Sequence, residues 1–173
     1  MSILKRITIE YSEREDRIRL AGLTDNNQTI GLWLTMRLMS RLINHCLNLV
    51  EKNTPELEKT PATNQQSRKT VQKFIQQSAE QQLVDETAVK LANNSPNNLI
   101  VEIDIRNDSK GVAITFKDEL NSNYETYLSS QQLRQWLGML HMIWQKTEWP
   151  NLVWPDWMSN SPAETAPSLT SIH

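Results

Sequence analysis

Residues 7–52, ITIEYSEREDRIRLAGLTDNNQTIGLWLTMRLMSRLINHCLNLVEK, match residues 101–146, VEIDIRNDSKGVAITFKDELNSNYETYLSSQQLRQWLGMLHMIWQK, without a gap. Few residues are identical, but apolar positions, turn-forming runs and a hydroxyl residue before the last segment recur 94 positions apart. A chance match aligns one strand or one helix, whereas here three alternating segments, two turns and a helical stripe coincide. We predict two copies of one structural unit; two halves that merely share a common β-β-β-α pattern are the alternative.

Each copy is predicted to form three strands followed by a helix. Apolar and polar residues alternate through ITIEYSE (7–13) and RIRLAGL (17–23), as in strands with one buried face, and TIGLWL (29–34) is the third strand. Runs of turn-forming residues separate these segments. The second copy repeats the pattern with LIVEIDIR, GVAITFKD and NYETYLS.

The last segment of each copy is predicted to be an amphipathic helix. Thr35 should cap the first helix, and Ser129 or Ser130 the second, because a hydroxyl oxygen can accept a hydrogen bond from an otherwise unpaired backbone N–H. Apolar residues then recur at spacings of three and four, which indicates one buried stripe per helix. The stripes are Met39, Leu42, Ile43, Cys46, Leu49 and Val50 in the first copy, and Leu133, Trp136, Leu137, Leu140, Ile143 and Trp144 in the second.

These elements predict an α+β fold built from two β-β-β-α repeats, at about 3–52 and 99–146. The strands should form two three-stranded antiparallel sheets or one continuous sheet, covered by the helices and related by a pseudo-two-fold axis, because a helix stripe and a sheet face each need a cover. We expect one domain over residues 1–158, followed by a disordered tail over 159–173.

The connection between the repeats is predicted to have two parts. Residues 53–66 contain two prolines and few apolar residues, which favours a mobile loop. Residues 67–92 lack glycine and proline and should form one helix, continuous or broken in the middle. Its expected apolar stripe is Val71, Phe74, Ile75, Ser78, Val84, Ala88 and Leu91.

A tryptophan-rich segment, TEWPNLVWPDWMSNS, follows the second helix. Pro150 and Pro155 prevent a regular helix through it, so residues 149–158 should be extended or turned. Two interpretations remain open at this point. The rings of Trp149, Trp154 and Trp157 either cover their own domain or bind a partner, since tryptophan is enriched at interface hot spots.

Composition excludes several classes of site. The net charge of −2 argues against a globally basic nucleic-acid coat and against a general binder of anionic membranes. The four glycines are too scattered for a phosphate loop, and a single cysteine, Cys46, provides neither an intramolecular disulfide nor a cysteine zinc site. No stretch has the length and apolarity of a membrane span or a signal peptide, so a cytoplasmic location is expected.

Chemistry-bearing residues form no catalytic pattern that we recognise. Glu102 and Asp104 alternate with apolar residues and should lie on an outward strand face, and His45 and His141 lack metal-ligand spacing. We therefore expect no catalytic residue, no metal site and no cofactor. A small enzyme that uses Glu102, Asp104 and His141 is the least favoured functional hypothesis.

The favoured hypothesis is a non-enzymatic protein–protein interaction module, such as an assembly factor, an adaptor or an accessory subunit. Two small sheets and two helices leave strand edges, aromatic residues and a further helix to be buried, and homodimerisation would bury them. We expect another protein as the partner, and a homodimer. The predicted contact residues are Trp149, Trp154, Trp157 and Trp33.

The alternative is a protein that binds single-stranded nucleic acid. The basic residues of the first copy, which carries eight Lys or Arg and six Asp or Glu, would form an arginine and aromatic sheet face with Trp33. The predicted contact residues are Arg14, Arg17, Arg19, Arg37 and Arg41.

Two known architectures have a similar order of elements. The order β-β-β, helices, β-β-β, helix resembles the head domain of the scaffold proteins that support DNA ligase in end joining, which implies an interaction module without catalysis. The paired strand–helix repeats are also similar to those of Pur-alpha and Whirly-type single-stranded nucleic-acid binders, which have four strands per repeat. Neither resemblance assigns a site residue in this chain.

Overall fold

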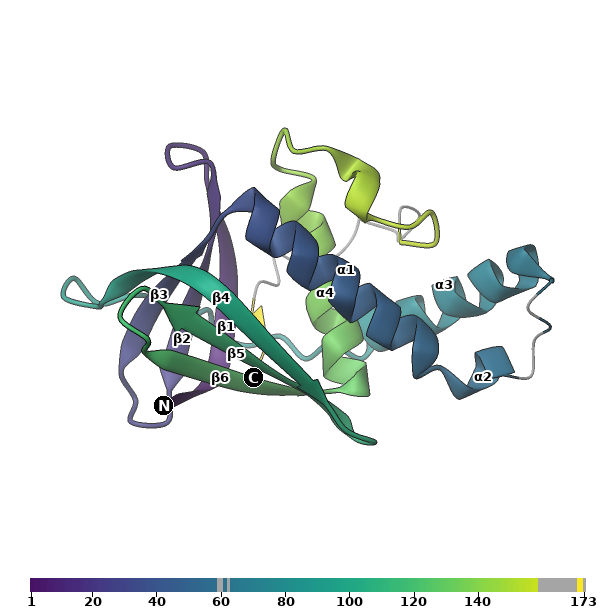
Figure 1. Ribbon diagram of the computed structural model, residues 1–173, viewed down its shortest axis with the longest axis horizontal. Helices are drawn as coiled ribbons and strands as arrows, with labels where there is room; N and C mark the ends of the chain where they lie inside the picture. The colour runs from purple at the N-terminus through teal and green to yellow at the C-terminus, as the bar shows by residue number, and fades with distance from the viewer. Residues whose placement is uncertain (59–60, 62, 159–170, 173) are drawn as a thin grey trace.

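Two β-β-β-α units build the fold, as the repeat predicts. The computed structural model describes residues 1–58, 61, 63–158 and 171–172. The strands lie together, and α2 and α3 lie farthest from them (Figure 1). The elements are β1 (Ser2–Ser12), β2 (Arg17–Thr24), β3 (Thr29–Leu34), α1 (Met36–Lys52), α2 (Pro55–Glu58), α3 (Gln65–Gln81), β4 (Asn97–Asn107), β5 (Gly111–Asp118), β6 (Asn123–Ser129), α4 (Ser130–Trp144), a short 3-10 helix η1 (Asn151–Val153) and β7 (Ser171–Ile172).

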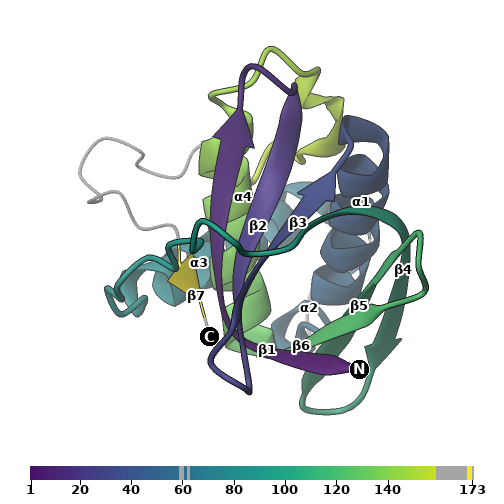
Figure 2. The ribbon, with the colours of Figure 1, turned by 90° about the vertical axis from the view of Figure 1, so that its left-hand side faces the viewer.

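Six strands close into a mixed β-barrel rather than into antiparallel sheets alone. Within each unit the strands are antiparallel, but β3 pairs with β4 and β6 pairs with β1 in parallel. The long helical connection over 35–96 allows β4 to return parallel to β3, because parallel neighbours require a crossover. Both closing pairings are short: Gly31–Trp33 of β3 pair with Asn97–Leu99 of β4, and Ser2–Ile3 of β1 pair with Tyr124–Glu125 of β6 (Figure 2).

The structure corrects the repeat alignment in the first strand of each unit. Ile9 pairs with Leu20, and Ile105 pairs with Ile114, so Ile9 corresponds to Ile105 and not to Ile103. From β2 onward the offset of 94 holds: Ile18 pairs with Leu34, and Val112 pairs with Leu128. The first turn of the second unit is therefore two residues shorter.

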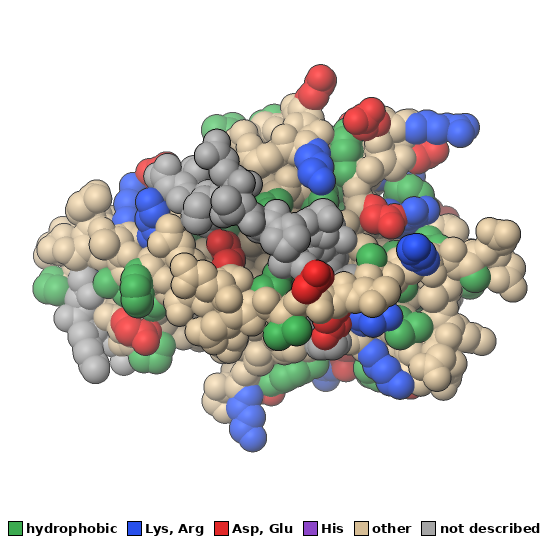
Figure 3. Space-filling view, turned by 180° about the vertical axis from the view of Figure 1, so that it is seen from behind, with side chains coloured by type: hydrophobic (Ala, Val, Ile, Leu, Met, Phe, Trp, Pro, Cys, Tyr) green, Lys and Arg blue, Asp and Glu red, His purple; other side chains and the backbone are tan. Residues whose placement is uncertain are grey.

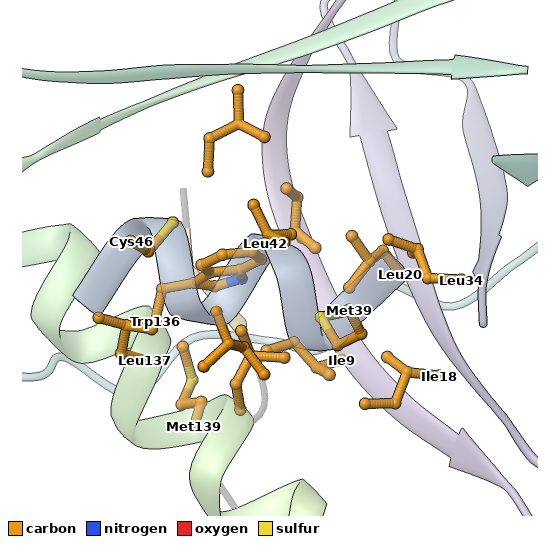
Figure 4. Close-up of a cluster of buried hydrophobic side chains, with 14 of the residues drawn as sticks. Ile9, Ile18, Leu20, Leu34, Met39, Leu42, Cys46, Trp136, Leu137 and Met139 are labelled. Atoms are coloured by element: carbon orange, nitrogen blue, oxygen red, sulfur yellow. The ribbon is translucent and has the colours of Figure 1, made fainter. Parts of the chain in front are cut away.

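One core joins the barrel to α1 and α4. Ile9, Ile18, Leu20 and Leu34 come from the strands and lie beside Met39 and Leu42 of α1, with Trp136 of α4 close by (Figure 4). Leu42 is 2% exposed and Trp136 is 1% exposed, as the predicted stripes require.

Both helices of the repeat begin at the predicted hydroxyl residues. The Thr35 side chain accepts a hydrogen bond from the Leu38 amide. Ser129, rather than Ser130, caps α4: its hydroxyl accepts from the Gln132 amide, and the Gln132 side chain accepts from the Ser129 amide. This reciprocal pair is a capping box.

The connection departs from the predicted single helix. Helix α3 ends at Gln81, and residues 83–92 form neither helix nor strand; two of their amides bond to the barrel. The Val89 amide donates to Thr8 Oγ1 at 2.7 Å, and the Ala92 amide donates to Thr29 Oγ1 at 3.2 Å. A short helix, α2, occupies part of the expected loop over 53–66. The expected disordered tail, 159–173, lies outside the described residues except for Ser171–Ile172, which pair with β1.

Candidate functional site

The three tryptophans of the C-terminal segment lie against their own domain. Trp149, Trp154 and Trp157 are 7%, 7% and 5% exposed. The ring of Trp144 on α4 makes edge contacts with Trp149 and Trp154, with centroids 4.9 and 5.9 Å apart. The Trp149 indole donates to Asp16 Oδ1 at 2.6 Å. These contacts agree with the covering interpretation; a direct role of these rings in partner binding stays a prediction.

His141 lies on α4 beneath this segment. Its ring packs edge-on against Trp154 with centroids 4.8 Å apart, and this burial lowers the pKa of the imidazole below its usual 6.5. The unfolded chain therefore binds a proton more readily than the folded one. The contribution of His141 to the free energy of unfolding should be fully present above pH 6.5 and should fall as the pH drops from 6.5 toward the lowered pKa.

We expect the His141→Gln variant to lose that part of the pH dependence. Urea denaturation across this pH range measures it, with His45→Gln as the matched control because His45 is exposed on α1. An unchanged pH profile in His141→Gln would show that protonation of His141 is not coupled to unfolding.

Trp33 and Arg19 meet on the outer face of β1–β3. Arg19 lies 5.1 Å from the centre of the Trp33 ring and pairs with Glu10 at 2.5 Å. Pairing in register places Glu10, Arg19 and Trp33 side by side across the three strands. The contact between Arg19 and Trp33 that the sequence predicts is thus present, but the guanidinium of Arg19 also pairs with the Glu10 carboxylate.

The remaining arginines of the predicted nucleic-acid face are dispersed over other elements. Arg14 lies in the β1–β2 turn, with a 92% exposed side chain near Glu15, and Arg17 begins β2. Arg37 and Arg41 are exposed on α1. On the face shown in Figure 3, basic and acidic side chains are interspersed.

The carboxylates Glu102 and Asp104 lie on the outward face of β4, as expected. Lys117 of β5 contacts both of them, at 2.7 and 2.6 Å. The side chains of the two acids are 59% and 53% exposed, which is the geometry of a solvated ion-pair ladder. His141 contacts Trp154 and Gln145 instead, so these three residues do not form one cluster.

A groove at the end of the helices is the feature that the sequence did not predict. It has a volume of about 260 Å³ and lies between the α1–α2 junction, α3 and the first turn of α4. Its lining is partly apolar, through Pro55, Ile75 and Ala79, and partly polar. The polar lining comprises Asn53, Thr54, Glu56, Ser78, Gln82, Ser130, Gln131 and Arg134.

Arg134 is the buried cation of this groove. The residue is 6% exposed, and its Nη2 donates to Thr54 Oγ1 and to Gln72 Oε1, both at 2.8 Å. Its Nη1 is buried without a hydrogen-bond partner. Burial lowers the pKa of Arg134 to about 10, while the nearby Glu56 opposes that shift, so the group remains a cation at neutral pH.

Helix α3 buries two glutamines that the predicted stripe leaves out, whereas Val71, Ile75 and Ser78 of that stripe are half-buried. Gln72, Gln76 and Ala79 are buried, whereas Phe74 is 72% exposed. Gln76 donates to the Arg134 carbonyl at 2.8 Å.

The opposite helix, α4, also contributes polar contacts to this packing. Gln135 donates to the Ala79 carbonyl at 2.9 Å. Gly138 lets Glu80 approach closely, because a Cβ at this position would lie 2.6 Å from Glu80 Oε1. Hydrogen bonds and one close approach therefore hold α3 on α4, and Phe74 stays exposed.

In the described ranges no group of three His, Cys, Asp or Glu residues could hold a metal ion. The helices that the structure describes include none with the length and apolarity to cross a bilayer.

No family model, no curated protein and no solved structure matches this chain.

Proposed function

We propose that the protein is a non-enzymatic protein–protein interaction module, an assembly factor, adaptor or accessory subunit, and that its partner binds along α3 and the adjoining groove. The observation that carries this proposal is the orientation of α3. A helix in a monomeric domain normally turns its apolar side to the core, but α3 buries glutamines and exposes Phe74. Large exposed apolar side chains beside a concave surface favour partner binding.

The groove extends this apolar surface. Ile75, next to Phe74 in sequence, lines the groove together with Pro55 and Ala79. An apolar side chain of a partner could therefore occupy the groove while its backbone bonds to the polar lining. The similar order of elements in the ligase-scaffold heads, which are interaction modules, supports the same class as a fold-level analogy.

The experiment is site-specific photo-crosslinking in living cells of the native host. A photoreactive phenylalanine at position 74 should give discrete adducts with one partner. The same residue at Leu120, which is 86% exposed in the β5–β6 turn, is the matched control and should give none. An adduct with a second copy would identify the expected homodimer, and an adduct with another chain would identify the partner protein; equal labelling at both positions would refute the proposal.

The predicted tryptophan contacts are tested by the same approach. Trp33 is partly exposed and can contact a partner directly, whereas Trp149, Trp154 and Trp157 are buried and would need to leave their own domain. Adducts from position 33 would extend the interface to the outer face of β3.

The nucleic-acid alternative has one supporting contact, the stacking of Arg19 on Trp33. Glu10 pairs with the same arginine, and the other four arginines are spread over the β1–β2 turn, β2 and α1. We therefore expect no salt-sensitive binding of single-stranded oligonucleotides. Fluorescence anisotropy at low ionic strength measures it, with Arg19→Gln as the comparison; affinity that falls with salt and with Arg19→Gln would support the alternative.

A further inference from the structure

We infer that the groove recognises a carboxylate of its partner, an aspartate or glutamate side chain beside an apolar residue, and that the Arg134 guanidinium binds this carboxylate. This inference rests on the proposed function, because it names the partner chemistry of the same groove.

The first argument is the unsatisfied state of Arg134. A guanidinium has five N–H donors in a planar fork, and a buried one is normally paired with a carboxylate. Here the neutral acceptors Thr54 Oγ1 and Gln72 Oε1 bond to Nη2, and the buried Nη1 has no partner. Burying a cation in this state is costly, and an anion held in the groove beside the guanidinium would offset part of that cost electrostatically.

The second argument is that neighbouring groups fix the position of this cation. Gln72 also donates to Thr54 Oγ1 at 3.3 Å, and Thr54 donates to the Val50 carbonyl at the end of α1. The Gln76 side chain holds the backbone of Arg134 through its carbonyl. The guanidinium is thus held between α1, α3 and α4, and a ligand would not need to order it.

The third argument is the electrostatic setting of the groove mouth. Ser130 and Gln131, in the first turn of α4, line the groove, and the positive end of a helix dipole favours an anion there. Glu56 lines the same groove and interacts electrostatically with Arg134. One cation beside one carboxylate suits a single negative charge better than a phosphate dianion, which Glu56 would repel.

The fourth argument is the apolar surface beside the cation. Ile75 and Pro55 line the groove near Arg134, and Phe74 precedes Ile75 on α3. A ligand that places a carboxylate on Arg134 therefore has apolar surface within reach of its neighbouring side chain. This combination indicates an acidic residue next to an apolar one.

The test begins with a phage-displayed library of random peptides selected on the full chain. We expect the selected peptides to share an acidic residue beside a large apolar residue. A Phe74→Asp variant, used as a parallel target, should not enrich them. If no peptide distinguishes the wild type from Phe74→Asp, the proposed function fails; if peptides are enriched without an acidic preference, the proposed function stands and the inference on Arg134 fails.

A thermodynamic cycle with one selected peptide then tests the pairing. Fluorescence polarisation should show at least about a tenfold loss of affinity when the peptide glutamate becomes glutamine, or when the protein carries Arg134→Gln. Combining both changes should cost little more than either alone, because both remove the same ion pair. Additive losses would refute the pairing, since a merely structural Arg134 gives no coupling to the peptide charge.

Two further measurements test the inference without the Arg134→Gln variant, which could fail to fold. The Glu56→Gln variant should bind the acidic peptide several-fold more tightly, because it removes a like charge; Glu119→Gln, with the same charge change in the exposed β5–β6 turn, should not. A peptide with phosphoserine in place of the glutamate should bind more weakly. Tighter binding of the phosphopeptide, or no effect of Glu56→Gln, would overturn the assignment of a carboxylate.

Discussion

Replacing Trp136 with alanine should lower the free energy of unfolding by about 3–5 kcal/mol, a large fraction of the stability of a typical domain. Trp136 is 1% exposed and lies between α4 and the side chains of α1, where Leu42 packs in the core that also holds the inner strand residues (Figure 4). The barrel and the two helices share this one core, so the cavity left by the indole cannot close without moving α1 relative to α4.

Urea denaturation measures this loss, and two other substitutions calibrate it. Trp136→Phe should cost much less than Trp136→Ala, because the Trp136 Nε1 has no hydrogen-bond partner among the described residues and most of the apolar volume is kept. Trp33→Ala should also cost less, because Trp33 is only partly buried on the outer face of β3. A Trp136→Ala chain as stable as Trp33→Ala would contradict the shared core.

The core residues of the two helices could be predicted because they recur at regular helical spacing. Leu42 and Trp136 recur on apolar helical stripes at the repeat offset, and the structure buries both. The cap Thr35, and the choice between Ser129 and Ser130 for the second helix, follow in the same way, because a cap depends on local chemistry; the structure selects Ser129. The two-copy architecture could therefore be predicted from the sequence.

The alignment error in the first strand has a simple physical cause. Successive side chains of a strand point to opposite faces, so a slip of two residues leaves every residue on its original face. Matching Ile9 to Ile103 or to Ile105 predicts the same buried face, and only the hydrogen-bonded register separates the two. The two parallel pairings that close the barrel could not be predicted either, because they depend on the path of the long connection between the units.

The groove could not be predicted because α3 buries two glutamines and exposes a phenylalanine, whereas sequence patterns place apolar residues in the core. A search for buried stripes assigns Val71, Phe74 and Ile75 to the core and leaves Gln72 and Gln76 in solvent. In the structure Gln72 and Gln76 are buried and Phe74 is exposed, because Gln72 accepts from Arg134 and Gln76 donates to the Arg134 carbonyl. The only available signal was the spacing of four between the two glutamines, which a surface helix shows equally well.

Ending the chain after Glu148 should destabilise the domain by about 4 kcal/mol or more, since four buried side chains are removed and each burial contributes about 1.5–3 kcal/mol before the entropy of ordering the segment is subtracted. Trp149, Trp154, Trp157 and Met158 are between 0% and 7% exposed, and their loss uncovers the ring of Trp144. It also removes the Pro150 carbonyl, which accepts from the Trp144 indole at 3.3 Å, and the indole bonded to Asp16.

Thermal and urea unfolding of three chains decide whether the segment is part of the core. A chain ending after Met158 should keep most of the stability, because it retains all four buried side chains. Leu152→Ala should have almost no effect, because Leu152 is 95% exposed within the same segment. If the chain ending after Glu148 unfolds at the same urea concentration as the full chain, the segment does not stabilise the domain, and the interpretation that its tryptophans bind a partner gains support. If it unfolds earlier and Phe74 still forms its crosslinks, the two roles separate: the tryptophan segment completes the domain, and α3 with its groove carries the interaction.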